Sequence, residues 1–260
     1  MVKAILLAAG QGTRLRPYTL DRPKAMVELV GMPMIERQCR VLERAGISDR
    51  VIVGGYRADR FASGLGRCLV NPAFETTNMV ASLMTARAEM DGCQDILVCY
   101  GDIVYEPIVL QSVLEGDGEI AVAVDRQWRR FWALRMADPL ADAETMRMEN
   151  GRIRELGKRP LSYDEIEGQY IGLFRIRAEA VAPLLAFHDG LDRSARYDGK
   201  DFGNMYATSF LQALINAGWD VRAAPIDNGW LEVDTVEDLT LYERMHRTGE
   251  LRSYCDLDKT

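Results

Sequence analysis

Residues 4–15 read Ala-Ile-Leu-Leu-Ala-Ala-Gly-Gln-Gly-Thr-Arg-Leu, an apolar run that passes directly into a glycine-rich turn. The apolar run predicts a buried strand, and Gly10 and Gly12 predict a loop whose backbone N–H groups can approach an anion closely. Two cations stand behind the loop, Arg14 and, in the segment Arg22-Pro23-Lys24-Ala25-Met26, Lys24. We therefore interpret this strand end as a cradle for a triphosphate.

Other interpretations of this loop are weaker. A plain hairpin remains an alternative, because turns of this composition are common. The loop matches neither the G-x-x-x-x-G-K-[ST] P-loop nor a full G-x-G-x-x-G, since Leu15 stands where the third glycine would be. A dehydrogenase is disfavoured further because Gly54-Gly55, and no acidic residue, follows the second predicted strand.

The bulk composition favours a small-molecule partner. The chain has 260 residues and a formal net charge of −7, with an isoelectric point near 5.1. This acidic balance disfavours nucleic acid and anionic membrane as partners, although a local cationic pocket can still hold a nucleotide. The length suits one large α/β domain with a substantial core.

The five cysteines, at positions 39, 68, 93, 99 and 255, form no C-x-x-C pair and are accompanied by only two histidines. Metal fingers and disulfide scaffolds need other spacings. Cys39 and Cys99 lie in apolar runs, which predicts buried thiols in a reducing cytoplasm. The apolar run at positions 4–9 is too short for a signal peptide, and no window approaches a membrane span.

The first half of the chain alternates strands and helices. Apolar periodicity predicts strands at 4–9, 50–53, 95–100 and 120–124, and helices at 34–45 and 78–89, the second capped by Thr76 or Thr77. A strand, helix, strand order implies parallel pairing with a right-handed crossover. The predicted fold class is thus α/β, a single Rossmann-like domain with a mostly parallel mixed sheet flanked by helices.

The second half departs from this alternation. Residues 149–153 predict a turn in a small antiparallel extension, 170–175 a strand, and 178–187 and 204–217 helices, while the polar, glycine-rich residues 189–203 predict a surface loop and a candidate lid. A last helix begins after Asp234-Thr235, and its charged tail either contacts a second subunit in a homodimer or frays. Within one domain, 1–260, we expect a nucleotide-binding half at about 1–125 and an acceptor-binding half at about 126–260.

Acidic residues follow two of the predicted strands. In an open parallel sheet ligands bind beyond the carboxyl ends of the strands, so the loops at 10–14, Gly55-Tyr56 and Gly101-Asp102 are expected to share one crevice. Glu232 and Asp234 alternate with apolar residues and so point to one face. Asp102 and Asp234 suit Mg²⁺, which binds through one or two carboxylates and substrate phosphates. A turn cap for Asp102 and a helix N-cap for Asp234 are the structural alternatives.

Candidates for the second substrate lie later in the chain. Lys158, which follows a strand and precedes Pro160, is either a solvated loop charge or a point charge for a phosphate or phosphonate. Arg126, Arg129 and Arg130 would favour an acceptor with extra negative charge. An aromatic box around an ammonium group, with ordinary core packing as its alternative, could be built from Trp128, Trp132, Tyr170 and Trp230 beside Glu232.

Together these segments carry a family resemblance. The signature L-A-A-G-x-G-T-R-L at 7–15, the downstream Pro23-Lys24, Gly101-Asp102 and the late acidic pair resemble the sugar-1-phosphate nucleotidyltransferase superfamily, nearly from end to end. The segments 76–80 (Thr-Thr-Asn-Met-Val), 167–173 and 230–234 are more similar to its phosphocholine and phosphonate cytidylyltransferase branch.

The resemblance implies a role for each matching position. Base and ribose would face Leu7, Ala8, Ala9, Gly10 and Gly55, with Asn78 and Ser82 beside the nucleotide, and the triphosphate would face Gly12, Thr13, Arg14 and Lys24. Asp102 and Asp234 would hold the metal, and Lys158 the phosphorus group of the acceptor.

The implied reaction is an Mg²⁺-dependent transfer of CMP from CTP to a small phosphate or phosphonate such as phosphocholine or 2-aminoethylphosphonate, with release of pyrophosphate. Because the nucleophile is already ionised near neutral pH, no general base is needed. A sugar-1-phosphate nucleotidyltransferase that uses another NTP and a non-catalytic nucleotide-binding regulatory subunit are the alternatives. Intact Lys24, Asp102 and Asp234 argue against the second of these.

Overall fold

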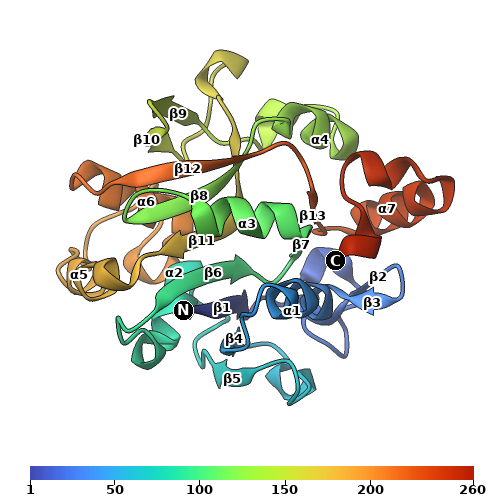
Figure 1. Cartoon of the computed structure of the whole chain (residues 1–260), viewed down its shortest axis with the longest axis horizontal. Coiled ribbons are helices and arrows are strands. Elements are labelled where there is room, and N and C mark those ends of the chain that lie inside the picture. Colours follow the sequence, from blue (N-terminus) through green and yellow to red (C-terminus); the bar gives the residue numbers. More distant parts are fainter.

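The first strand, β1 (Val2–Ala8), lies inside a nine-stranded mixed sheet whose order is β5-β4-β1-β6-β11-β8-β12-β10-β9 (Figure 1). The structure is a computed structural model and describes residues 1–260. The other strands of this sheet are β4 (Arg50–Gly54), β5 (Arg67–Val70), β6 (Asp95–Tyr100), β8 (Ile120–Asp125), β9 (Met146–Glu149), β10 (Arg152–Leu156), β11 (Gln169–Ile176) and β12 (Val221–Ile226).

The sheet is parallel in its first part and mixed in its second. β1 pairs in parallel with β4 and β6, as the strand, helix, strand order predicts, and β5 extends this set. β11 runs antiparallel to both β6 and β8, whereas β12 is parallel to β8. The predicted α/β fold with a mixed sheet is confirmed, and the single sheet crosses the expected division near residue 125 without a break.

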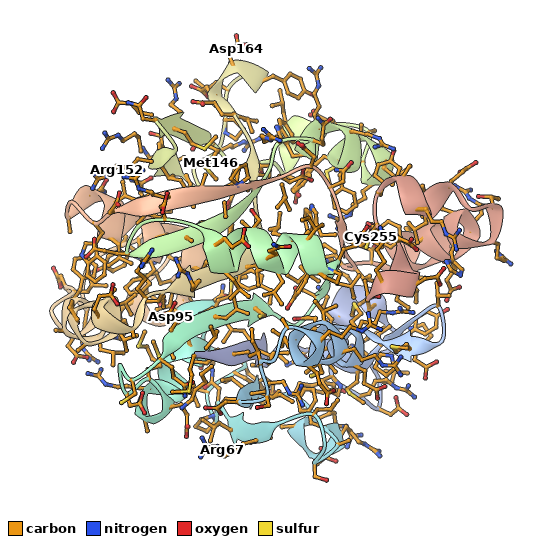
Figure 2. All side chains as sticks on the ribbon, viewed as in Figure 1. Arg67, Asp95, Met146, Arg152, Asp164 and Cys255 are labelled. Carbon is orange, nitrogen blue, oxygen red and sulfur yellow. The ribbon has the colours of Figure 1, made fainter.

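Helices cover both faces of the sheet (Figure 1). One hydrophobic cluster joins α1, α3, α4 and α7 to one face, and a second joins α2, α5 and α6 to the other. Successive residues of β1 alternate between the two clusters, because side chains of a strand point to opposite faces in turn. Figure 2 shows how side chains fill the layers between helices and sheet. The helices are α1 (Met34–Arg44), α2 (Met79–Thr85), α3 (Pro107–Glu115), α4 (Trp128–Arg135), α5 (Ala178–Asp189), α6 (Ala207–Asn216) and α7 (Val236–Thr248).

Three small antiparallel units complete the fold. β9 and β10 form the predicted hairpin, whose turn residues Asn150 and Gly151 have φ of 52° and 76°. Such positive φ values at both positions suit a tight hairpin turn. The other two units are the pair β2 (Glu28–Leu29) with β3 (Met32–Pro33) and the ribbon of β7 (Ile103–Tyr105) with β13 (Trp230–Glu232).

The start of α2 differs from the sequence prediction. The N-cap is Asn78, whose side-chain oxygen accepts from the Met79 N–H, and neither Thr76 nor Thr77 fills this position. Both threonine hydroxyls instead donate to the Ala73 carbonyl and close the preceding turn. The regular helix also ends at Thr85, and a 3₁₀ turn at Arg87–Glu89 takes the place of its predicted last turn.

The last helix and the segment after it are well anchored. Thr235 caps α7 in a capping box with Asp238, so Asp234 is not the cap that the sequence permitted. The tail is not frayed, because the buried Arg37 guanidinium donates to the Leu257 carbonyl and to the Thr260 hydroxyl. Whether a second subunit contacts this tail stays a prediction.

Cys39, Cys99 and Cys255 are buried, which confirms the prediction for the first two, and Cys68 and Cys93 are exposed. All five are free thiols. None of the helices combines the length and apolar character that crossing a membrane requires.

Candidate active site

Three carboxylates converge beyond the carboxyl end of β6. Asp102 is the second residue after this strand, Glu232 ends β13, and Asp234 comes two residues later. The β7–β13 ribbon sets Glu232 opposite Ile103, and the Val233 N–H donates to the Asp102 carbonyl at 3.0 Å. One oxygen of each carboxylate lies within 4.8 Å of the others. Segments more than 120 residues apart in the chain thus form one acidic cluster.

Lys24 and Arg14 partly neutralise this acidic cluster. The Lys24 ammonium donates to Asp102 at 2.7 Å and also to Asp234, and Arg14 donates to Asp234 at 2.8 Å. Burial opposes the charge on Lys24, yet Asp102 and Asp234 raise its pKa above the ordinary value. Burial acts likewise on Asp234, but the Lys24 ammonium holds the pKa of that carboxyl below its usual range. Lys24 is therefore a permanent cation inside the cluster.

Glu232 is held by a cation that the sequence analysis missed. Burial raises the pKa of Glu232 above its ordinary value, and Arg135, whose guanidinium donates to it at 2.6 Å, opposes this effect. The same guanidinium donates to both carboxylate oxygens of Asp238. Arg135 ends α4 and is buried, so α4 and α7 together fix the position of Glu232.

The acidic cluster fits a divalent cation of the hard type. One oxygen of Asp102, Oδ1, is buried and has no hydrogen-bond partner, although its second oxygen accepts from Lys24. An unpaired buried carboxylate oxygen is costly, and Mg²⁺ prefers such oxygens as ligands. The donor set is all carboxylate, with no sulfur or imidazole.

A cavity of about 160 Å³ lies beside the acidic cluster, at the ends of β1 and β6. It contains several residues predicted to bind the nucleotide, together with some that were not. The lining residues are Leu7, Ala9, Gly10, Phe74, Thr77, Asn78, Met79, Ser82, Tyr100 and Asp102. We call this space the β1 pocket.

Other predicted nucleotide residues stand behind the β1 pocket or beside it. Ala8 packs in the core on the opposite face of β1 from Leu7. A Cβ at Gly55 would lie 2.5 Å from the Phe74 side chain and 2.8 Å from the Ala9 carbonyl, so glycine allows Phe74 to reach the lining. The Tyr56 N–H donates to the Ala9 carbonyl, and the Tyr56 hydroxyl donates to the Leu20 carbonyl.

The remaining residues of the glycine-rich loop lie next to the acidic cluster. Gly12 has a φ of 61°, and a Cβ there would lie 2.9 Å from the Lys24 Cβ. Glycine therefore brings the loop and Lys24 into close contact. Thr13 and Arg14 belong to the following 3₁₀ turn, from which Arg14 reaches Asp234.

A second cavity, of about 260 Å³, adjoins the β1 pocket. The two share Met79 and Tyr100 in their walls, and the acidic cluster contributes Asp102 to one and Glu232 to the other. We call this second space the β11 pocket. Its lining is Met79, Tyr100, Trp132, Asp142, Glu144, Gln169, Tyr170, Ile171, Gly172, Tyr206, Thr208, Trp230 and Glu232.

Some residues assigned to the acceptor from sequence lie elsewhere. Trp128 is only 5% exposed and packs against Trp132 and Tyr163, outside the lining of the β11 pocket. Lys158 also lies outside it, on an exposed turn where its ammonium donates to Glu155 at 2.6 Å. Its placement corresponds to the alternative of a solvated loop charge.

The arginines near α4 are likewise engaged away from the β11 pocket. Arg126 pairs with Asp227, Arg129 lies over the ring of Tyr163, and Arg130 lies over the ring of Tyr254. The expectation of an acceptor with extra negative charge has no support in these contacts. Of the four arginines on or near α4, Arg135 is the one that contacts the acidic cluster. Sequence periodicity could not show this, because all four lie on or near the same short helix.

Trp230 combines packing with a hydrogen bond. It is 2% exposed, packs against Phe131 and donates its indole N–H to Asp125 at 2.9 Å. We expect Trp230→Phe to lower the free energy of unfolding by about 2 kcal/mol or more, since it removes a buried bond and leaves a void. Urea denaturation measures this loss; an unchanged midpoint together with a raised KM for the acceptor would instead favour the aromatic box.

Most of the residues that sequence reasoning missed line the β11 pocket. They come from the loop before β9, the start of β11 and the start of α6, and they are Asp142, Glu144, Gln169, Tyr206 and Thr208. Of these, only Gln169 stands in a segment that carries the family resemblance, 167–173, and no role was assigned to it there. The sequence does show two acidic residues, at 142 and 144, in the loop before β9. Their spacing alone could not show that they face a cavity.

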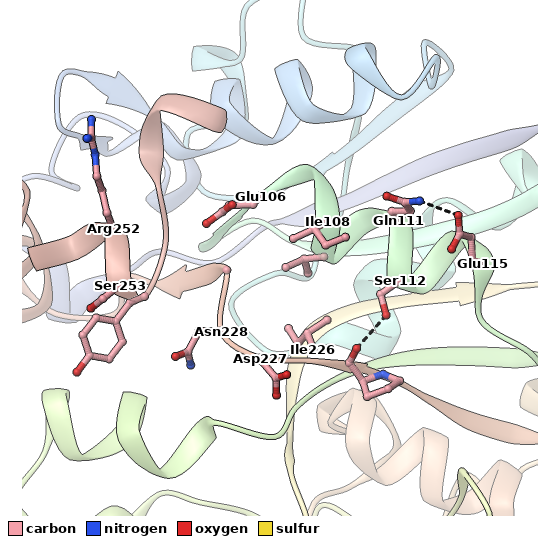
Figure 3. A pocket seen from close by; sticks show the side chains of 14 residues that line it. Glu106, Ile108, Gln111, Ser112, Glu115, Ile226, Asp227, Asn228, Arg252 and Ser253 are labelled. Carbon is pink, nitrogen blue, oxygen red and sulfur yellow. Dashed lines mark hydrogen bonds between the residues drawn. The ribbon is translucent and has the colours of Figure 1, made fainter.

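A larger cavity, of about 550 Å³, lies at the other end of the β7–β13 ribbon, between α3 and the C-terminal segment (Figure 3). Glu106 and Gly229, which line it, flank the ribbon on the side opposite Asp102 and Glu232. No residue predicted from sequence to be functional lines this cavity. Size alone therefore does not mark the site.

The chain matches characterised proteins over most of its length. It is 42% identical over 247 residues, 92% of this chain and 98% of the relative, to the CTP:phosphoglutamine cytidylyltransferase of Campylobacter jejuni. It is 50% identical over 60 residues, 23% of this chain and 26% of the relative, to the choline-phosphate cytidylyltransferase of Streptococcus pneumoniae.

A solved structure shares the fold. The inositol-1-phosphate CTP transferase from T. maritima superimposes with a TM-score of 0.72, at 21% identity, over 98% of this chain and 97% of the other. The model of the MobA-like NTP transferase domain matches residues 4–196, a span that contains most of β1, the glycine-rich loop, Lys24 and Asp102. By this match and by the end-to-end similarity to a cytidylyltransferase, the chain is a nucleotidyltransferase that belongs to the MobA-like NTP transferase family.

Proposed function

We propose that this enzyme transfers CMP from CTP to a small phosphate-bearing acceptor, with Mg²⁺ as its cofactor and pyrophosphate as the second product. The observation that carries the proposal is the position of the acidic cluster, which lies where the β1 pocket and the β11 pocket meet. A reaction between a nucleotide in one pocket and an acceptor in the other would take place beside these carboxylates. The names of the relatives from C. jejuni and S. pneumoniae support cytidylyl transfer.

The chain's own residues would bring two anions together. An acceptor oxygen attacks the α-phosphorus of CTP in line, the bond to the β-phosphate oxygen breaks, and pyrophosphate leaves with that electron pair. The nucleotide base and ribose lie in the β1 pocket, held by Asn78 and Ser82. Lys24 and Arg14, already at the acidic cluster, neutralise the phosphates, so catalysis consists of positioning and charge stabilisation.

Asp102 and Asp234, with Glu232 beside them, would hold the metal. A bound Mg²⁺ supplies Lewis-acid stabilisation of the phosphate oxygens and a template for their alignment. Lys24 would exchange its carboxylate partners for phosphate oxygens as the nucleotide enters, because both anions compete for the same ammonium.

For the acceptor we propose a small phosphate or phosphonate that also carries a nitrogen group, with phosphoglutamine first and phosphocholine and 2-aminoethylphosphonate next. The relative that matches nearly the whole chain is named for phosphoglutamine, whereas the similarity to the choline-phosphate enzyme covers 23% of this chain. Five aromatic residues and three carboxylates in the lining of the β11 pocket are consistent with a nitrogen cation on the acceptor.

The test is a pyrophosphate-release screen with Mg²⁺, the four NTPs and these three acceptors, with sugar 1-phosphates as further candidates. We expect release with CTP and with at least one of the nitrogen-bearing acceptors, and the loss of release when Mg²⁺ is chelated. Release only with a sugar 1-phosphate would establish the alternative enzyme, and no release with any pair would favour a nucleotide-binding subunit without turnover.

A further inference from the structure

Two carboxylates in the β11 pocket have no countercharge. Asp142 and Glu144 line one wall of it, and neither takes part in an ion pair. No lysine, arginine or histidine is among the lining residues, although Lys200 lies 5.4 Å from the ring of Tyr206. Glu232, the third acid, differs because Arg135 neutralises it. The pocket thus carries net negative charge that the protein itself does not balance.

The fold nonetheless fixes these acids in place. The side-chain amide of the buried Gln169 accepts from the Glu144 N–H at 2.9 Å and donates to the Glu144 carbonyl, so it grips the backbone on both sides. Asp142 accepts from the Trp132 indole N–H at 3.0 Å. Thr145 is bonded to Lys158 through its backbone and its hydroxyl. The half-buried Glu144 and the exposed Asp142 are thus held side by side without a countercharge, which is unfavourable unless a cationic ligand supplies the missing charge.

We propose that Glu144, aided by Asp142, binds an ammonium group of the acceptor, and that this contact selects acceptors that carry one. The inference rests on the proposed function and specifies its second substrate. The phosphate end of the acceptor would lie at the acidic cluster, where Glu232 forms the border of the β11 pocket. The ammonium end would then reach the opposite wall at Glu144.

The remaining lining suits this assignment. The hydroxyl of Tyr170 is buried without a hydrogen-bond partner, although the residue lines the β11 pocket. It can accept from an ammonium N–H that Glu144 does not use. Tyr100 packs edge-on against Tyr170 at 5.7 Å, so the wall is aromatic as well as acidic. Rings beside a carboxylate stabilise a cation by their π faces as well as by charge.

The ionisation of Glu144 gives the contact a pH signature. Burial, followed by the charges of Asp142 and Asp198, raises the pKa of Glu144 to about 7, and the Thr208 hydroxyl opposes this shift. Tyr100, Tyr170 and Glu232 also face this space. Because an ammonium favours the ionised carboxylate, binding should tighten as pH rises through about 7 and level off above it. The phosphate groups of the substrates also titrate in this pH range, so the pH dependence of KM must be compared with that of a variant that lacks the Glu144 charge.

The experiment measures KM for phosphoglutamine, and for the same molecule without its α-amino group, with wild type, Glu144→Gln and the matched control Glu149→Gln. Glu149 lies on the neighbouring hairpin with its side chain 63% exposed. We expect Glu144→Gln to raise KM for phosphoglutamine about tenfold or more, the equivalent of losing a charge-assisted hydrogen bond. In Glu144→Gln, KM for CTP and KM for the deaminated acceptor should stay within about twofold of the wild-type values, because neither depends on the lost charge-assisted hydrogen bond. Glu149→Gln should resemble wild type.

Two further readouts protect the test. Glu144→Gln should melt no lower than wild type at pH 8, since it removes an unpaired charge from a half-buried position and keeps the side-chain shape. In wild type, we expect KM for phosphoglutamine to fall between about pH 6 and pH 8, a range that spans the raised pKa of Glu144. In Glu144→Gln this fall should be absent. Equal KM values in wild type and Glu144→Gln would overturn the inference alone. Absence of pyrophosphate release by wild type with every nitrogen-bearing acceptor would overturn the proposed function and the inference with it.

Discussion

Replacing Asp102 by asparagine should lower kcat for Mg²⁺-dependent pyrophosphate release about a thousandfold, or about 4 kcal/mol at 1.36 kcal/mol per factor of ten. Asn keeps the shape and one oxygen but removes the negative charge. The lost group is the carboxylate whose buried Oδ1 has no partner within the chain. Lys24 would keep Asp234 as its partner, so the acidic cluster should stay folded.

Steady-state kinetics with saturating CTP and acceptor measure this effect, and a thermal melt confirms the fold. Asp59→Asn is the matched control, because the Asp59 side chain is 69% exposed on the 3₁₀ turn after β4. Asp234→Asn should behave like Asp102→Asn. If Asp102→Asn retained activity within about twofold of wild type, far from the loss that a metal ligand implies, the assignment of the metal to this cluster would be wrong.

The largest effect on stability is expected for Asp125→Ala. This carboxylate is fully buried at the end of β8 and accepts four hydrogen bonds, from the backbone N–H groups of Gln127 and Asn228 and from the side chains of Asn228 and Trp230. Alanine leaves four donors unpaired, three of them buried, at about 1–3 kcal/mol for each group that water cannot reach. We expect the free energy of unfolding to fall by about 4 kcal/mol or more.

Urea denaturation at neutral pH gives this quantity directly. Asp227→Ala is a suitable control. It removes a half-exposed partner of Arg126 from the loop between β12 and β13, to which Asp125 is bonded through Asn228, and it should cost less than about 1 kcal/mol. Asp125→Asn should fall between the two, since one acceptor oxygen remains. Similar unfolding midpoints for Asp125→Ala and Asp227→Ala would contradict the role of Asp125 as the anchor of this loop.

Local patterns were sufficient to predict the elements of the sheet. β1, β4 and β6 are apolar runs bounded by glycines and polar residues, and α1 shows helical spacing up to its end at Arg44. The antiparallel orientation of β11 could not be predicted in this way. A strand buried on both faces has the same composition in either direction, so only its pairing with β6 and β8 decides its orientation.

The acidic cluster and the β11 pocket differ in how far they could be predicted. Asp102, Glu232 and Asp234 stand at recognisable strand ends, and the structure brings them together as we expected for a metal site. Glu144 and Arg135 act through tertiary contacts, with Gln169 in one case and Glu232 in the other, which no spacing in the sequence records. Aromatic residues were misleading for the same reason, because packing placed Trp128 in the core and Trp132 at the cavity.

Met79 and Tyr100 line both the β1 pocket and the β11 pocket. In the proposed reaction the product is one covalent molecule that occupies both pockets, whereas each reactant occupies one. Two linked groups bound at once dissociate more slowly than either group alone, because each holds the other at high effective concentration. Departure of the finished conjugate, and not bond formation, would then set the pace of the catalytic cycle.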